Sequence, residues 1–394
     1  MVTLSASRLE PITGDAVVLV NELVRLAVAQ RASDIHLEPK HDKMHVRLRI
    51  DGALVDVQPI AFSVASNVVS RVKVLAKMDI ADKRLPQDGQ IAIELDGGKR
   101  VHLRASTFPA SQGEKVVLRI LSSQQLIAFD GLGLERDAQE TMRDVLSRPQ
   151  GFVVTCGPTG AGKTSTLYAL MQLIDPRAVN VVTLEDPVEV ELYGLTQGQV
   201  NVRAGFTFAS GLRAILRQDP DVILVGEMRD AETAGIAMQA ALTGHLVLST
   251  LHTSDTVETI VRLVDLGIEP WIVANALSAV LAQRLVRVTC PHCKRSAKLE
   301  RDFWDNDELL LPAESVIVRP AGCDKCMRTG YRGRTGIFEV VDLDDEMRDL
   351  VKAKAPAREY REIYLRRKLP SLRRAGMQKI LAGVTTVDEV LRVT

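Results

Sequence analysis

The sequence lacks the features of a membrane-spanning, secreted or strongly basic protein. No apolar run approaches the ~20 residues that a membrane-spanning helix needs. The N-terminus has no charged-then-apolar signal pattern, so we expect a cytosolic protein. The 50 basic and 50 acidic residues cancel, which disfavours a globally basic nucleic-acid binder. With 46% hydrophobic residues, the 394-residue chain can instead build two or three globular domains.

Cysteine is also scarce, and four of the five cysteines form two C-x-x-C pairs separated by 29 residues. In a long chain without a secretion signal, this pattern favours a metal site over disulfides. Two such pairs can make a closed four-sulfur site, for which Zn²⁺ is the default metal and a structural role is expected. The predicted ligands are Cys290, Cys293, Cys323 and Cys326. Cys156 is predicted to be a buried, apolar-like residue.

The first region of the chain is predicted to be an α+β domain with a hairpin-rich sheet. Residues 15–30 have the composition of a buried or amphipathic helix, and residues 44–50 alternate between apolar and polar side chains. Asp51-Gly52 then gives a strong hairpin signal, and a second hairpin is predicted around residues 96–98. We assign residues 1–121 to this domain and residues 122–133 to a linker.

The second region, residues 134–394, is predicted to be an α/β domain. Short apolar runs are separated by helical or loop sequence, as a parallel sheet buried on both faces requires. These runs are Phe152–Thr155, Val181–Leu184, Val222–Val225 and Leu246–Ser249. The cysteine-bearing segment, residues 288–334, interrupts the domain, and residues 343–394 are predicted to form a helical, locally basic tail.

A phosphate-binding loop follows the first of these strands. Residues 157–164 match G-x-x-x-x-G-K-[ST], and a predicted helix begins directly after them. The glycines let backbone N–H groups surround phosphate oxygens, and the helix N-terminus favours negative charge. Lys163 is predicted to neutralise the β- and γ-phosphates of ATP, and the Thr164 hydroxyl to bind Mg²⁺. The predicted nucleotide-binding residues are Gly157, Pro158, Thr159, Gly160, Ala161, Gly162, Lys163, Thr164 and Ser165.

Acidic residues and a histidine follow the neighbouring predicted strands. Residues 221–227 form an apolar strand that ends in Gly226-Glu227, and residues 184–189 end the preceding strand with clustered carboxylates. Such carboxylates can hold Mg²⁺ or orient an attacking water. His252 follows a later strand, where it is predicted to sense the γ-phosphate, whereas His245 is more simply a structural residue.

With these motifs in order, the chain resembles the type II secretion and type IV pilus assembly ATPases of the secretion ATPase superfamily. The resemblance covers nearly the whole chain from about residue 14, and the four-cysteine segment closes its series of motifs. It includes an aspartate box at residues 183–189, an atypical Walker B motif at residues 216–230 and a histidine box at residues 243–253. It implies a RecA-like ATPase domain, a PAS-like N-terminal domain that docks over the nucleotide, and a hexameric ring.

The resemblance also implies roles for individual residues. Glu227 becomes the leading catalytic or Mg²⁺-linked carboxylate, with Glu185 as its partner and His252 near the γ-phosphate. Family members carry arginines where this chain has Arg203, Arg213 and Arg217. Guanidinium groups match phosphate bidentately. The N-terminal domain therefore adds four candidate phosphate-contacting residues, Arg47, Arg49, Arg104 and Arg119.

The resulting hypothesis is an ATP hydrolase that powers type II secretion or type IV pilus assembly. Its implied partners are other copies of the chain, an inner-membrane platform protein and membrane-anchored components. Longer members carry an additional N-terminal domain, which we expect this chain to lack.

A pilus retraction ATPase is the nearest alternative, but that group lacks the four-cysteine segment. A nucleic-acid motor is disfavoured because aromatics make up 4% of the chain. A non-catalytic scaffold is disfavoured by the intact Lys163, Thr164 and Glu227.

Overall fold

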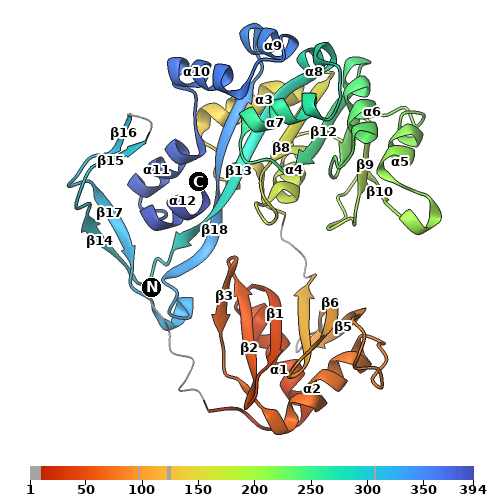
Figure 1. The fold of residues 1–394 in the computed structure, drawn as a ribbon, viewed down its shortest axis with the longest axis vertical. Helices are drawn as coiled ribbons and strands as arrows, with labels where there is room; N and C mark the ends of the chain where they lie inside the picture. Colours follow the sequence, from red (N-terminus) through yellow and green to blue (C-terminus); the bar gives the residue numbers. More distant parts are fainter. Residues whose placement is uncertain (1–9, 96–97, 122–125, 306–307) are drawn as a thin grey trace. The chain divides into compact units, whose positions relative to one another are not determined.

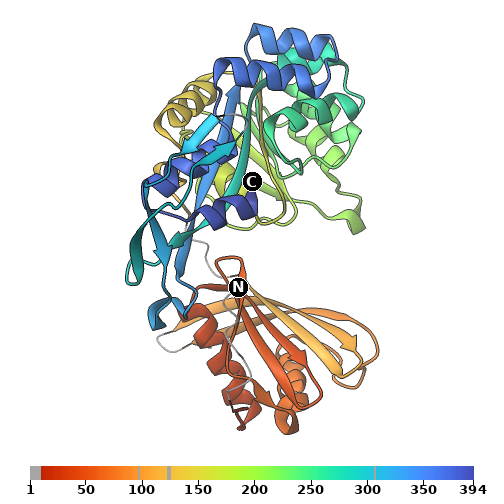
Figure 2. The same cartoon turned by 60° about the vertical axis from the view of Figure 1, so that its left-hand side comes forward.

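The structure is a computed structural model that describes residues 10–95, 98–121, 126–305 and 308–394 (Figures 1 and 2). The chain divides into two compact units, residues 1–124 and 125–394. The tip of the predicted second hairpin, residues 96–97, and part of the predicted linker, residues 122–125, lie outside the described residues. Among the described helices, none has both the length and the apolar character needed to cross a membrane.

Unit 1 is an antiparallel sheet with two helices. In its described residues the sheet runs in the order β3-β2-β1-β7-β6-β5, and β4 pairs with β2. Asp15 caps the first helix by accepting hydrogen bonds from the Val17 and Val18 N–H groups. The elements are α1 (Ala16–Ala29), β1 (Ala32–Pro39), β2 (Lys43–Ile50), β3 (Ala53–Asp56), β4 (Ile60–Ala61), α2 (Phe62–Leu75), β5 (Gln87–Leu95), β6 (Lys99–Ala110) and β7 (Gly113–Ile120).

The two faces of this sheet differ, as the alternation in residues 44–50 predicts. Met44, Val46 and Leu48 of β2 are buried in the core together with apolar residues of α1 and α2. The alternate positions carry charged side chains on the other face, because successive residues of a strand point to opposite sides. The α+β character predicted for this region therefore agrees with the structure, and its likeness to a PAS domain stays a prediction.

Unit 2 is built on a mostly parallel sheet in the order β10-β9-β11-β12-β8-β13-β18. Within this sheet of described strands only β18 runs antiparallel to its neighbour. The four predicted apolar runs lie within β8, β9, β11 and β12. The strands are β8 (Gly151–Cys156), β9 (Val181–Glu185), β10 (Thr196–Gln199), β11 (Val222–Val225), β12 (Leu246–Leu251), β13 (Leu277–Thr289) and β18 (Tyr331–Asp342).

Helices cover both faces of this sheet (Figure 1). One apolar cluster includes α3 (Arg136–Ser147) and α4 (Lys163–Met171), and the larger one includes the other helices. These are α5 (Phe208–Ile215), α6 (Ala231–Leu242), α7 (Thr256–Asp265), α8 (Pro270–Ala276), α9 (Asp345–Lys352), α10 (Ala357–Arg367), α11 (Leu372–Leu381) and α12 (Val387–Val393). The predicted helical tail agrees with α9 to α12.

Residues 129–132, which the sequence predicted as part of the linker, instead pack within unit 2: the turn η2 (Phe129–Gly131) buries Phe129, and Leu132 is buried as well. Their apolar side chains explain the difference, since a free linker would leave them in water.

The segment between β13 and β18 forms two small antiparallel pairs and the turn η4 (Asp324–Cys326). Its strands are β14 (Lys294–Lys298), β15 (Phe303–Asp305), β16 (Glu308–Leu311) and β17 (Val316–Pro320).

Candidate active site and candidate metal centre

The predicted phosphate loop connects β8 to α4, with Gly162 directly before the first residue of the helix. Gly157, Gly160 and Gly162 have φ angles of 151°, 80° and 88°, a region that side-chain-bearing residues rarely adopt. The Lys163 ammonium donates to the carbonyl oxygens of Gly157 at 2.7 Å and Pro158 at 3.2 Å. Burial lowers the pKa of Lys163. The loop therefore places a desolvated cation at the N-terminus of a helix.

Two further predicted site residues lie beside this cation. His252, directly after β12, has its Nδ1 3.4 Å from the Lys163 Nζ. Its Nε2 lies 3.6 Å from a carboxylate oxygen of Glu227, which follows β11. The sheet order explains this contact, because β11 and β12 are adjacent and parallel, so their carboxyl ends share one edge. Lys163, His252 and Glu227 thus form a continuous row at the carboxyl edge of the sheet.

Arg229 extends this row; it lies within the motif at residues 216–230, but no role was predicted for it from the sequence. Its guanidinium donates to the other oxygen of Glu227 at 2.5 Å. This hydrogen bond raises the pKa of Arg229. Both oxygens of the Glu227 carboxylate therefore face a nitrogen-bearing side chain. The position of Arg229, two residues after Glu227 in a loop, carries no periodic signal that would have shown this contact.

Glu185 has a different environment from Glu227. Its side chain is buried, and its carboxylate accepts hydrogen bonds from Tyr168, from Thr183 at 2.6 Å and from Gln197 at 3.1 Å. Burial, followed by the bond to Glu185, raises the pKa of Tyr168, so its hydroxyl stays a donor at neutral pH. Glu185 thereby links α4 to β9 and β10. None of its described hydrogen bonds involves Glu227, His252 or Lys163.

The predicted arginines of unit 1 lie on the polar face of its sheet. Register partners run across four strands in the order Arg49, Asp34, Arg119, Arg104. Asp34 is buried and pairs with Arg119 at 2.9 Å and with Arg49 at 3.8 Å. Arg104 is exposed and has no ion pair among the described residues.

Arg47 lies in the neighbouring row, where it pairs with Glu38 at 2.7 Å. Burial opposes ionisation of this carboxyl. The Arg47 and Lys115 side chains outweigh that effect and hold the pKa of Glu38 at about 2. The charge of Arg47 is therefore balanced by a carboxylate within unit 1.

The predicted arginines of unit 2 lie on and around α5. Arg213 donates to Glu232 of α6 at 2.6 Å, and Arg217 donates to the Arg213 carbonyl at 2.7 Å. Arg203 is exposed in the turn η3 (Val202–Ala204). The remaining candidate, His245, has its Nδ1 3.0 Å from the Ala240 carbonyl oxygen, which fits the structural reading.

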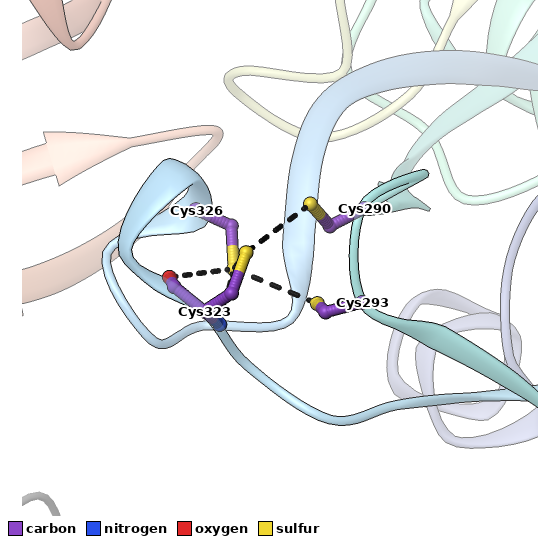
Figure 3. Close-up of side chains that lie close together, drawn as sticks. All are labelled: Cys290, Cys293, Cys323 and Cys326. Carbon is purple, nitrogen blue, oxygen red and sulfur yellow. Dashed lines mark hydrogen bonds between the residues drawn. The ribbon is translucent and has the colours of Figure 1, made fainter.

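The four cysteines of the two C-x-x-C pairs converge on one point (Figure 3). Their sulfur atoms all lie within 4.8 Å of one another, with separations of 4.0 Å for Cys290–Cys323 and 3.9 Å for Cys293–Cys326. Four sulfurs about 2.3 Å from one tetrahedral metal stand about 3.8 Å apart, whereas a disulfide needs about 2.0 Å. The cluster therefore has the dimensions of a metal site.

Hydrogen bonds to one sulfur support the same conclusion. The backbone N–H groups of Cys323 and Gly330 donate to the Cys326 Sγ, each at 3.2 Å. Burial opposes ionisation of this thiol, but these N–H groups outweigh it and lower the pKa of Cys326 to about 7. N–H groups that donate to a sulfur favour its thiolate form, which is the form that binds Zn²⁺, so the geometry of the cluster fits this metal.

Residues 13–392 match the family model described as "Type II/IV secretion system protein". The chain belongs to the type II/IV secretion system protein family. It is 48% identical over 380 residues to type II secretion system protein E of Pseudomonas aeruginosa, covering 95% of this chain and 75% of that protein. It is 45% identical to type II secretion system ATPase E of Vibrio cholerae, with the same coverage. The type IV pilus assembly ATPase TfpB of Acinetobacter baylyi is 43% identical, covering 95% and 65%.

Solved structures of more distant proteins show the fold of this family member. The Legionella pneumophila ATPase DotB has a TM-score of 0.68 at 20% identity, covering 98% of this chain and 97% of that one. The pilus retraction motor PilT has a TM-score of 0.61 at 24% identity, covering 95% and 96%. The α/β architecture assigned from the sequence is thus shared with these two proteins.

Proposed function

We propose that this protein is a Mg²⁺-dependent ATP hydrolase, a motor that powers type II protein secretion or type IV pilus assembly. The observation that carries the proposal is the row formed by Lys163, His252 and Glu227 beside a complete phosphate loop. The row combines a cation for the phosphates with a carboxylate for the water, which is what hydrolysis of a phosphoanhydride requires. Membership in a family of secretion ATPases supports the same activity.

Each site residue has a proposed role. The backbone N–H groups of residues 157–165 and the N-terminus of α4 bind the phosphates, and Lys163 offsets their charge. Glu227 orients and deprotonates the attacking water, and His252 contacts the γ-phosphate. Thr164 and Glu227 offer the hard oxygen donors that Mg²⁺ prefers, and the ion, when bound, neutralises phosphate charge. Glu185 supports catalysis indirectly, through Tyr168 of the phosphate-loop helix.

We propose a hexameric ring in which arginines of one copy contact the nucleotide of the next. A hexamer would bring side chains of one copy to the nucleotide of the next, so arginines remote from the loop would gain a phosphate partner. The candidates are Arg47, Arg49, Arg104, Arg119, Arg203, Arg213 and Arg217. Arg104 and Arg203 are the strongest of these, because neither side chain has an ion pair or a hydrogen bond in the described part of the chain that would have to break.

The cysteine cluster is proposed to hold a structural Zn²⁺. Cys290, Cys293, Cys323 and Cys326 complete a four-coordinate shell and leave no position for a substrate. The ion would tie η4 to the end of β13, joining both ends of the inserted segment.

The cellular role is proposed from the relatives. The type II secretion proteins cited above, at 45–48% identity, are the more similar group, so we place secretion before pilus assembly. The motor is proposed to act at the cytoplasmic face of the inner membrane, on a platform protein and membrane-anchored components. The four-cysteine cluster disfavours the retraction alternative, because the resemblance implies that pilus retraction ATPases lack this segment. Stimulation of ATP hydrolysis by single-stranded DNA would instead support nucleic-acid translocation.

The test is the steady-state hydrolysis of ATP by the purified full chain and by its Glu227→Gln variant. We expect the variant to lose about 10²–10⁴-fold in kcat while still binding ATP, because only the water-directed carboxylate is removed. Glu140→Gln, which neutralises an exposed acid on α3, is the matched control and should retain full activity. Near wild-type turnover of Glu227→Gln would remove this carboxylate from the mechanism. Absence of hydrolysis by the wild-type chain would overturn the function itself.

A further inference from the structure

The phosphate loop has a neighbour that none of the sequence motifs includes. Strand β13 pairs in parallel with β8 up to Ala282, which lies opposite Cys156, the last residue of β8. The next residue, Gln283, therefore lies alongside the loop that leaves β8. A Cβ atom on Gly157 would stand 2.7 Å from the Gln283 carbonyl oxygen, and one on Gly162 would stand 3.3 Å from the Gln283 amide nitrogen. The loop thus packs directly on β13.

The Gln283 side chain makes one defined hydrogen bond to this loop. Its Nε2 donates to the Ala161 carbonyl oxygen at 2.7 Å, and the side chain is 1% exposed. Its Oε1 is buried with no hydrogen-bond partner among the described residues. Leaving a buried amide oxygen unpaired costs about 1–3 kcal/mol, so a residue chosen for stability alone would not be an amide.

The contact has a consequence for the loop backbone. In a trans peptide the C=O and the following N–H point in opposite directions. Drawing the Ala161 carbonyl toward β13 therefore turns the Gly162 N–H away from β13. Gly162 precedes Lys163 at the start of α4, where backbone N–H groups bind phosphate.

We propose that Gln283 is a positioning residue of the phosphate loop, which holds the Ala161–Gly162 peptide so that the Gly162 N–H is presented to a nucleotide phosphate. The inference rests on the proposed nucleotide site and adds to it a residue from β13. Gln283 does not touch the nucleotide; it sets the direction of one donor that does.

The experiment measures equilibrium binding of a fluorescent ADP analogue by the full chain and by Gln283→Leu. Leucine keeps the approximate volume and removes the donor together with the unpaired oxygen. We expect the Kd to rise about tenfold or more. Thr385→Val is the matched control: it loses a buried hydrogen bond to the Arg287 carbonyl, on the same strand but away from the loop. We expect this control to lower the unfolding temperature to a similar extent and to change the Kd less than twofold.

A Kd for Gln283→Leu within twofold of the wild-type value would overturn the proposal, and so would an equal rise for Thr385→Val. Gln283→Met provides a second donor-free variant should the leucine variant fail to fold. If neither folds while Thr385→Val does, Gln283 is a folding residue and the proposal is wrong. ATP hydrolysis by the wild-type chain with an unchanged Gln283→Leu Kd would overturn this inference alone and leave the proposed function intact.

Discussion

Each of the two units buries a lysine, and the two lysines have opposite surroundings. Lys73 in unit 1 forms an ion pair with Glu114, also buried, and donates to the Asp82 carbonyl at 2.8 Å. Lys163 in unit 2 has two carbonyls and His252 as partners, with no carboxylate at ion-pair distance in the described part of the chain. A buried lysine that pairs with a carboxylate of the same chain has a structural role. A buried lysine without a carboxylate partner is suited to bind an anionic ligand such as a phosphate.

The largest expected effect comes from the unneutralised lysine. We predict that Lys163→Ala lowers kcat for ATP hydrolysis by at least about 10²–10³-fold, the usual loss when one electrostatic contact to the reacting group is removed. The unfolding temperature should stay unchanged or rise, because the substitution removes a desolvated charge that lacks a carboxylate. Parallel kinetic and thermal unfolding measurements test both halves. A large loss of stability would show that this lysine, like Lys73, is structural.

For Lys73 in unit 1 we expect the opposite result, a loss of stability. Lys73→Ala leaves the Glu114 carboxylate buried and unpaired, and we expect a loss of about 3–5 kcal/mol in the unfolding free energy of this unit. Lys73→Met with Glu114→Leu should recover much of the loss, since an apolar pair of similar volume avoids the unpaired charge. Denaturant unfolding of the single and double variants gives the comparison. A double variant no more stable than Lys73→Ala would contradict the ion-pair explanation.

The cysteine cluster extends the comparison to the opposite sign of charge. Four thiolates gathered at one point would require a cation, as Lys163 requires an anion. We expect about one zinc per purified chain, and its loss in the double variant Cys323→Ser, Cys326→Ser. The unfolding temperature should fall by about 5 °C or more, equivalent to ~2 kcal/mol in a domain of this size.

Cys156→Ala is the control for this metal analysis, because its sulfur is outside the cluster and its zinc content should not change. Full zinc occupancy in the double serine variant would place the metal elsewhere.

The parts of the fold that sequence predicts well are those with a simple physical signature. A parallel strand buried on both faces must be apolar throughout, which is why the runs at residues 152–155 and 222–225 correspond to β8 and β11. The alternation in residues 44–50 predicted the polar face of β2, because successive side chains of a strand point to opposite faces of the sheet. The C-x-x-C spacing places two sulfurs close together in the chain, so the convergence of the cysteines also followed from sequence.

The parts that sequence missed depend on packing. Strand β13 was not predicted, because Gln283, Arg284 and Arg287 interrupt its apolar pattern. The described hydrogen bond of the buried Gln283 side chain reaches a loop 122 residues away in the chain. The orientation of the Glu185 side chain could not be predicted either. A strand buried on both faces has no alternation of apolar and polar residues that would show which face of the sheet the carboxylate lies on. Sequence therefore located Glu185 at the end of a strand but not its hydrogen bonds to Tyr168 and Gln197.

The burial of Cys156 has a practical consequence for labelling. Its sulfur is fully buried, and burial raises the pKa of the thiol to about 11, so near pH 7 only about one molecule in 10⁴ presents the reactive thiolate. If the other four sulfurs bind the proposed Zn²⁺, the native chain should react very slowly with maleimide reagents. A single cysteine introduced on the surface of either unit would then carry a dye or spin label by itself. Pairs of such labels would report the distance between the two units during a cycle of ATP hydrolysis.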